Sequence, residues 1–288
     1  MTSSLIQATP GDAARIDAFL APHAVSSMYL RGNLANHGVG ITDAAHSTDF
    51  YLWQSQGTLQ GVFGITRSGY LMAQMPGMTR DAARAFGQTI HGRISRGMTG
   101  PADQVELVLC AMGLQDGPFQ LHHDEPLYQM DLTQLDGPVE PCRPMQQADL
   151  DRLIQWFEIY THETGLFDAE TARAEAPARA QADLAAGRLR LLEEGGEPVA
   201  MAALNAVVKG HAQVGGVYVP AEHRRKGYGA RITRALLQEA RANGIRSANL
   251  FANSPGAARV YDRIGFKQVG WYRIALLAQP TPIPGDTP

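Results

Sequence analysis

The chain has 288 residues, a formal net charge of −3 and 25 basic residues that are scattered along its length. A chain of this length is large enough for two domains of about 140 residues, each with its own hydrophobic core. Because the basic residues form no tract, the composition argues against nucleic-acid binding.

Further features of the sequence concern the cellular compartment. No apolar run is long enough to cross a membrane, and the N-terminus lacks a charged-then-apolar leader. Cys110 and Cys142 show no CxxC or paired spacing, which is typical of a reducing compartment without disulfides. We therefore expect a cytoplasmic protein that binds no membrane.

Three pairs of similar segments indicate that the chain contains an internal duplication. The pairs are 6–20 with 143–157, 56–64 with 195–203, and 128–132 with 272–276. Their offset is nearly constant, which predicts two domains, 1–136 and 137–278. A proline-rich linker over 136–144 joins them, and the proline-rich tail 279–288 is expected to be disordered.

In the first half, the pattern predicts a strand over 70–76, a helix over 81–96 and a strand over 105–110 that contains Cys110. The segment 77–81 follows the first of these strands without a glycine-rich loop, so no anion site is expected there. His122 and His123 are adjacent on an extended segment and point to opposite faces. No metal site is therefore expected.

The second half begins with a helix that carries several aromatic side chains. Core packing is favoured over the lining of an acceptor pocket for these residues, which are Trp156, Phe157, Tyr160 and Phe167. The alanine-rich stretch within 157–187 predicts a further helix.

The segment 214–219 is predicted to be a buried strand. Gly215 and Gly216 indicate a bulge, a close backbone approach or simple packing. Pro220 lacks an N–H and ends the ladder, so neighbouring strands are expected to separate near it.

A glycine loop and a helix follow this strand. Arg224-Arg225-Lys226-Gly227-Tyr228-Gly229 precedes a helical pattern that ends at Gly244, a residue suited to a left-handed cap. Unpaired N–H groups of such a loop and the positive end of the helix dipole favour a phosphate. The chain has no Gly-Lys pair for a P-loop, and Ile232 replaces the third glycine of GxGxxG.

The next elements are a strand over 245–251 and a helix with Ser254 as N-cap and Pro255 in its first turn. This spacing places Tyr261 about two turns into the helix. Gly265 ends the helix, and a last strand follows.

The motifs VxVP, RxxGxG and YxxxGF in this order resemble the GNAT superfamily of acyl-CoA-dependent N-acyltransferases, and within it the glycine N-acyltransferase-like branch. The resemblance covers about residues 188–277. It implies an α/β (mixed α+β) fold of two tandem GNAT-like domains, each a twisted mixed sheet flanked by helices. The first domain would be degenerate because it lacks the cofactor loop.

The resemblance also implies a set of site residues. Acetyl-CoA would be the co-substrate, without a metal, and Tyr261 would protonate the leaving thiolate. The residues that would contact the coenzyme are Val217, Tyr218, Val219, Arg224, Arg225, Lys226, Gly227, Tyr228, Gly229, Ala230, Asn253 and Ser254.

The sequence departs from the family pattern at the general base. Gln213 occupies the position of a glutamate found in histone-modifying relatives, and a glutamine side chain accepts no proton. His162, Glu163, His211, a water chain or an amine that arrives unprotonated remain alternatives. For His162 and Glu163, a solvated helix end is favoured over a catalytic role.

The sequence therefore predicts direct transfer of an acetyl or short acyl group to the primary amine of a small molecule or peptide. A non-catalytic acyl-CoA-binding or sensor protein is the alternative, because of Gln213 and the degenerate first domain. An aminoacyl-tRNA donor is a third hypothesis, which the intact RxxGxG disfavours. The amine, the acyl-chain length and the oligomeric state stay open.

Overall fold

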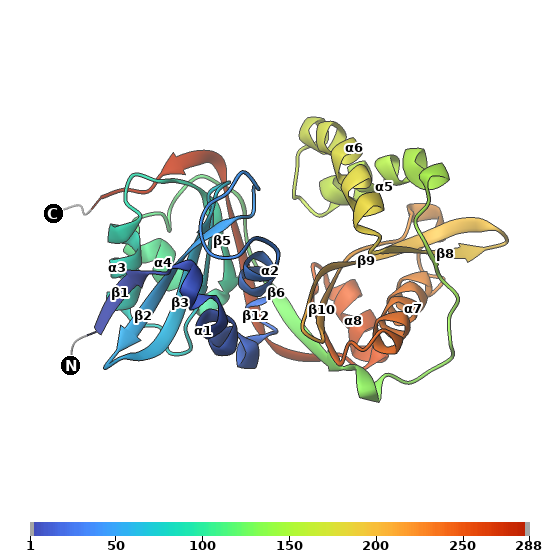
Figure 1. Cartoon of the computed structure of the whole chain (residues 1–288). Coiled ribbons are helices and arrows are strands. Elements are labelled where there is room, and N and C mark those ends of the chain that lie inside the picture. The colour runs from blue at the N-terminus through green and yellow to red at the C-terminus, as the bar shows by residue number, and fades with distance from the viewer. Residues whose placement is uncertain (1–2, 286–288) are drawn as a thin grey trace. The chain divides into compact units, whose positions relative to one another are not determined.

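A computed structural model describes residues 3–285 of the chain. The chain divides into two compact units (Figure 1). Unit 1 comprises Met1–Glu125 and Gly270–Pro288, and unit 2 comprises Pro126–Val269. Each unit has a mixed sheet flanked by helices, which confirms the predicted mixed α/β class.

In unit 1 the strand order is β1-β2-β3-β4-β5-β12, and only the β4–β5 pair is parallel among these neighbours. Separate apolar clusters lie on the two sheet faces, one packed by α1 and α2 and the other by α3 and α4. Its elements are β1 (Ser3–Gln7), α1 (Ala13–Leu20), α2 (Met28–His37), β2 (Thr48–Ser55), β3 (Thr58–Thr66), β4 (Tyr70–Gln74), α3 (Arg80–Thr89), β5 (Ile94–Pro101), α4 (Ala102–Ala111), the first part of β6 (Phe119–Asp131) and most of β12 (Lys267–Pro282).

In unit 2 the strand order is β6-β11-β10-β9-β8-β7, and only β10 and β11 are parallel. One apolar cluster joins α7 and α8 to one face of this sheet, and another joins α5 and α6 to the opposite face (Figure 1). Its remaining elements are β7 (Arg143–Pro144), α5 (Leu150–Glu163), α6 (Ala169–Ala186), β8 (Leu189–Glu194), β9 (Glu197–Val208), β10 (His211–Tyr218), α7 (Tyr228–Ala242), β11 (Ser247–Phe251) and α8 (Pro255–Ile264).

The boundary between the units falls inside two strands. The second part of β6, Leu127 to Asp131, pairs with β11 of unit 2. Most of β12, from Tyr272 to Pro282, pairs with β5 of unit 1. The β6 segment that pairs with β11 thus follows directly after residues 1–125 of unit 1. The β12 segment that pairs with β5 follows directly after unit 2.

Residues 3–20 of unit 1 and residues 143–163 of unit 2 have the same local structure. A short strand leads into a 3₁₀ turn with a capping box, and a helix follows directly. The capping box is formed by Thr9 with Asp12 in unit 1 and by Gln146 with Asp149 in unit 2. Reciprocal bonds of this kind satisfy N–H groups that a helix start leaves without partners.

The prediction for residues 81–110 was wrong in part. The helix α3 ends at Thr89, and residues 94–101 form strand β5. Residues 105–110, predicted to be a strand, lie in helix α4, where Val105, Val108 and Leu109 are buried. A short apolar run is compatible with either element, and here the buried positions follow the helical period. Cys110 therefore lies on a helix and is exposed.

At the C-terminus, the predicted disorder of the tail was wrong for residues 279–282, which form the end of β12. The final tail residues, 286–288, lie outside the described residues. Within residues 3–285, no helix combines the length and apolar character required to cross a membrane.

Candidate active site

The candidate site in unit 2 starts where β10 and β11 separate. These parallel strands are in register only from His211 to Gln213, opposite Ser247 to Asn249. Beyond this point β10 continues to pair with β9, but not in register with β11. The separation predicted near Pro220 therefore begins several residues earlier and opens one edge of β10.

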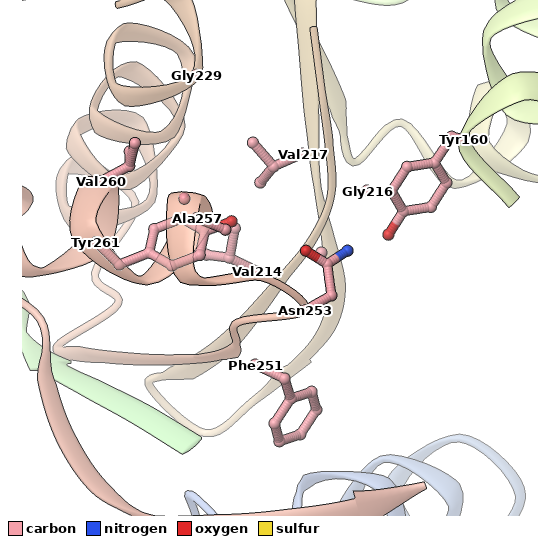
Figure 2. Close-up of a pocket in the computed structure, with 12 residues that line it drawn as sticks. Tyr160, Val214, Gly216, Val217, Gly229, Phe251, Asn253, Ala257, Val260 and Tyr261 are labelled. Atoms are coloured by element: carbon pink, nitrogen blue, oxygen red, sulfur yellow. The ribbon is translucent and has the colours of Figure 1, made fainter. Parts of the chain in front are cut away.

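A cavity of about 170 Å³ lies at this separation. Residues from α5, β10, α7, β11 and α8 line it, together with Asn253 from the loop before α8 (Figure 2). The lining residues are Tyr160, Val214, Gly215, Gly216, Val217, Gly229, Phe251, Asn253, Gly256, Ala257, Val260 and Tyr261.

The two glycines of β10 have distinct structural roles. The register between β10 and β9 shifts between Gly215 and Tyr218, which confirms the predicted bulge. Gly216 has φ +58°, a conformation that favours glycine. A Cβ at Gly215 would collide with the Asn205 side chain, so this residue is also required for packing. Both glycines leave the β10 backbone open to the cavity.

The RxxGxG loop forms the start of α7. Gly227 is the N-cap with φ +82°, and Arg225 also has a positive φ, +64°. Within the described part of the chain, the N–H groups of residues 225–229 donate to no acceptor, whereas Ala230 and Arg231 donate to the Gly227 carbonyl. These unpaired donors lie at the positive end of the α7 dipole, an arrangement that suits a phosphate.

The side chain of Arg224, the first residue of the RxxGxG motif, contacts Glu163, Val219 and Tyr218. Its guanidinium forms an ion pair with Glu163 at 2.6 Å and donates from Nε to the Val219 carbonyl at 3.0 Å. It also lies over the Tyr218 ring, 5.9 Å from the centroid. The ion pair with Glu163 raises the pKa of Arg224 further above its ordinary value.

The remaining cations of the loop are placed differently. Arg225 and Lys226 are exposed and form no ion pair with any described residue. Arg231, one turn into α7, pairs with Glu140 at 2.9 Å and Glu194 at 2.8 Å. Arg225 and Lys226 are therefore the loop cations available to an anion.

Tyr261 lies on α8 and lines the cavity, and its side chain is 6% exposed. Its ring packs against Phe266 at 6.0 Å and Tyr128 at 6.4 Å between centroids. The predicted start of α8 is confirmed: Ser254 is the N-cap and accepts from the Ala257 N–H at 3.2 Å. The Ser254 hydroxyl thus caps the helix, while Asn253 lines the cavity.

The candidates for a general base lie outside the lining set. Gln213 is buried, and His211 binds Ser247 at 2.6 Å and Asn249 at 2.9 Å at the far end of β10. Glu163 is paired with Arg224, and His162 is exposed. The described geometry brings none of these four groups into the lining of the cavity.

Eight of the twelve lining residues are not among the predicted site residues: Tyr160, Val214, Gly215, Gly216, Phe251, Gly256, Ala257 and Val260. Phe251, Gly256, Ala257 and Val260 lie on predicted elements, but their role depends on how far β10 and β11 separate. Tyr160 belongs to the aromatic set for which core packing was favoured, whereas the structure places it in the cavity lining. Trp156 and Phe157 of that set are core residues.

The histidine pair of unit 1 makes local contacts. His122 stacks on Phe119 with 4.3 Å between ring centroids, and His123 binds Glu125 at 3.2 Å. Across residues 3–285, no three His, Cys, Asp or Glu side chains are grouped as metal ligands.

Comparison with protein families and with curated proteins gives one match. Residues 150–266 match the model of the acetyltransferase (GNAT) family. Comparison with curated proteins finds no match.

Several solved structures share the fold over nearly the whole chain. A Drosophila protein aligns with a TM-score of 0.61 and 13% identity over 96% of this chain and 99% of its own. A GCN5-related N-acetyltransferase from Kribbella flavida aligns at 0.55 and 16% identity over 93% and 96%. A GCN5-related N-acetyltransferase from Sphaerobacter thermophilus aligns at 0.53 and 15% identity over 99% and 97%.

These similarities differ in what they cover. The acetyltransferase (GNAT) family match lies within unit 2, and the solved structures share the fold of nearly the whole chain.

Proposed function

We propose that unit 2 is an N-acetyltransferase that transfers an acetyl or short acyl group from its CoA thioester to the primary amine of a small molecule or peptide. The observation that carries this proposal is the set of unpaired N–H groups at residues 225–229, next to the cavity where β10 and β11 separate. A pyrophosphate fits the first feature, and an extended pantetheine arm fits the second.

Individual residues would have separate tasks in binding. The N–H groups of residues 225–229 would hold the pyrophosphate, with Arg225 and Lys226 adding positive charge. A Cβ at Gly229 would point into space that is otherwise open, because the atom nearest to it would be Val219 Cγ2 at 3.7 Å. The backbone of Val217, which lines the cavity, and that of Val219 would pair with the pantetheine arm, and Asn253, which also lines the cavity, would contact it.

The transfer step needs orientation, an oxyanion donor and an acid. The amine nitrogen attacks the thioester carbonyl carbon, a C–N bond forms, and the C–S bond breaks with its electron pair on sulfur. Tyr261 donates its hydroxyl proton to the thiolate, and the proton lost by nitrogen restores the hydroxyl through solvent. A β10 backbone N–H near Val217 stabilises the oxyanion. The cavity is lined by no Cys or Ser, so a direct transfer is proposed.

The proposal also includes the family branch, the origin of unit 1 and the cellular location. The motifs VxVP, RxxGxG and YxxxGF support the glycine N-acyltransferase-like branch. The order of strand, capped 3₁₀ turn and helix that both units share supports unit 1 as a degenerate copy of unit 2. In unit 1, the Gln104 side chain accepts from the Met75 N–H at 2.8 Å beside β4, which would occupy the ligand's place. The two free thiols support a cytoplasmic location.

Calorimetric titration with acetyl-CoA, followed by assay of CoA release with a panel of amines, tests the proposal. We expect binding and amine-dependent release of free CoA thiol. Binding without release by any amine would favour the sensor alternative. A lack of binding would contradict the assignment of the loop itself.

A further inference from the structure

The cavity has a second wall that faces Tyr261. Tyr160 is the α5 residue that lines the cavity, and Figure 2 shows it on the opposite side from Tyr261, with its hydroxyl directed toward Asn253. Tyr261 would protonate the leaving sulfur on its own side. The acceptor nitrogen must approach the carbonyl carbon from a different direction, and the Tyr160 side is available for it.

Packing fixes the orientation of Tyr160 before any substrate binds. Its ring meets the Tyr218 ring edge-on, with 6.2 Å between centroids and an interplanar angle of 73°. Trp156 packs on the same Tyr218 ring at 5.8 Å. One turn further along α5, Glu163 pairs with Arg224. The aromatic contacts therefore anchor α5 to Tyr218 at the end of β10, and the ion pair anchors it to Arg224 in the segment that follows.

The cavity chemistry sets a condition on the acceptor. Of its twelve lining residues, only Tyr160, Asn253 and Tyr261 have polar side chains, and none is Asp, Glu, His, Lys or Arg. An ammonium ion that enters such a lining loses water without gaining a carboxylate partner, which is unfavourable. A neutral amine needs only hydrogen-bond partners, which hydroxyl and amide groups provide.

We propose that Tyr160 contacts the acceptor and orients its nitrogen as a neutral amine. The hydroxyl oxygen of Tyr160 accepts one amine N–H, which leaves the nitrogen lone pair directed at the thioester carbon. This inference rests on the proposed function and narrows its substrate class. The acceptors favoured are primary amines that lose their proton near pH 8 or below, such as α-amino groups, rather than lysine-like amines with a pKa of about 10.4.

The first test removes the hydroxyl and keeps the ring. For Tyr160→Phe, we expect the KM for the probe glycinamide to rise about 3- to 10-fold, the effect of one lost hydrogen bond. The Kd for acetyl-CoA, measured by calorimetry, should stay within about twofold. Tyr70→Phe is the matched control, because Tyr70 lies on β4 of unit 1. An unchanged glycinamide KM, or an equal loss of affinity for both substrates, would overturn the role of Tyr160.

The second test compares amines of different basicity. At pH 7, glycinamide is about 10% neutral with a pKa near 8, whereas propylamine with a pKa near that of lysine is below about 0.1% neutral. We expect kcat/KM to favour glycinamide roughly 20- to 200-fold at pH 7 and the ratio to shrink as pH rises. Equal values at pH 7 would overturn the neutral-amine condition.

The two proposals fail in distinguishable ways. Wild-type protein that binds acetyl-CoA and transfers the acetyl group, while Tyr160→Phe retains its amine KM, refutes only the inference about Tyr160. Wild-type protein that binds acetyl-CoA but releases CoA with no amine of the panel refutes the proposed function, and this inference falls with it.

Discussion

At the scale of the residue, Gly227 and Gly229 differ in what a side chain would meet. Gly227 has φ +82°, so a Cβ would strain the backbone by about 1 kcal/mol. Gly229 lies in α7 without a positive φ, and a Cβ there would make only an ordinary contact with Val219 at 3.7 Å. The fold therefore tolerates alanine at Gly229 better than at Gly227.

Gly229→Ala consequently separates binding from stability. We expect an unchanged or slightly raised Tm, because alanine favours a helix by about 0.5–1 kcal/mol over glycine. The affinity for acetyl-CoA should fall about tenfold, since the methyl group displaces the phosphate from a backbone N–H. Thermal unfolding and calorimetry measure the two effects. Wild-type affinity in this variant would contradict the phosphate site.

Tyr261→Phe removes the proposed acid without removing the ring that packs against Phe266 and Tyr128. We expect kcat to fall about 100-fold or more, as for loss of a general acid, while the Kd for acetyl-CoA stays nearly constant. Steady-state kinetics measures kcat, and calorimetry measures the Kd for acetyl-CoA. Full turnover in the variant would remove Tyr261 from the acid role.

The residues of the site were predictable from sequence to different degrees. Gly229, Asn253 and Tyr261 were found because loop spacing and helix capping are local properties, and all three line the cavity. For Tyr160, the sequence favoured core packing over a place in the pocket, yet its side chain lines the cavity. Its position depends on the contact of its ring with Tyr218, which lies far away in sequence.

At the scale of the element, the junction of β7 and α5 depends on a buried carboxylate. Asp149 is 8% exposed and accepts from Arg143 at 2.7 and 2.8 Å and from the Gln146 N–H at 2.8 Å. Hydrogen bonds from Arg143, followed by the bond from the Gln146 N–H, hold the pKa of Asp149 below its ordinary value despite burial. The ionised form is therefore stabilised by folding.

The sign of the pH dependence follows from this lowered pKa. The contribution of Asp149 is complete above the unfolded pKa of about 3.9 and is lost as the pH falls through the lower folded value. We expect Asp149→Asn to lower the free energy of unfolding by about 1.5–3 kcal/mol at pH 7, and by less at pH 3. Urea unfolding at both pH values measures this difference.

Asp151→Asn provides the matched control. Asp151 is exposed in the first turn of the same helix, where its charge contributes below about 1 kcal/mol. A loss for Asp149→Asn no larger than that for Asp151→Asn, or one that grows toward pH 3, would refute the assignment.

Elements with a strong local signal were predicted well, and others were not. The helix α8 has an N-cap serine and a proline in its first turn, and it begins where these residues require. The run from Val105 to Cys110 has no such signal in its interior, and its helical form is fixed by burial of Val105, Val108 and Leu109. Tertiary packing therefore decides the element where local propensity is ambiguous.

At the scale of the whole molecule, linker composition and strand pairing place the domain boundary at different positions. The proline content of residues 136–144 suggested a division at 136/137. The compact units instead divide at 125/126 and 269/270, because residues 127–131 pair with β11 and residues 272–282 pair with β5. Long-range pairing of this kind leaves no local mark in the sequence.

This pairing leads to a prediction about isolated fragments. A fragment 126–269 keeps the β6 segment that pairs with β11, whereas a fragment 137–278 lacks it. A start at residue 137 instead of 126 also removes four buried side chains from the core shared with α7 and α8, namely Tyr128, Met130, Leu132 and Leu135. Four buried apolar side chains stabilise a fold by on the order of 6–12 kcal/mol, which is comparable to the whole stability of a domain.

We therefore expect 126–269 to fold and to bind acetyl-CoA, and 137–278 to aggregate or remain unfolded. Circular dichroism, cooperative thermal unfolding and calorimetric titration distinguish these outcomes. The extra residues 270–278 of the second fragment cannot compensate, because in the intact chain residues 272–276 pair with β5 of unit 1. Cooperative folding of 137–278 together with failure of 126–269 would show that β12, rather than β6, completes the sheet of unit 2.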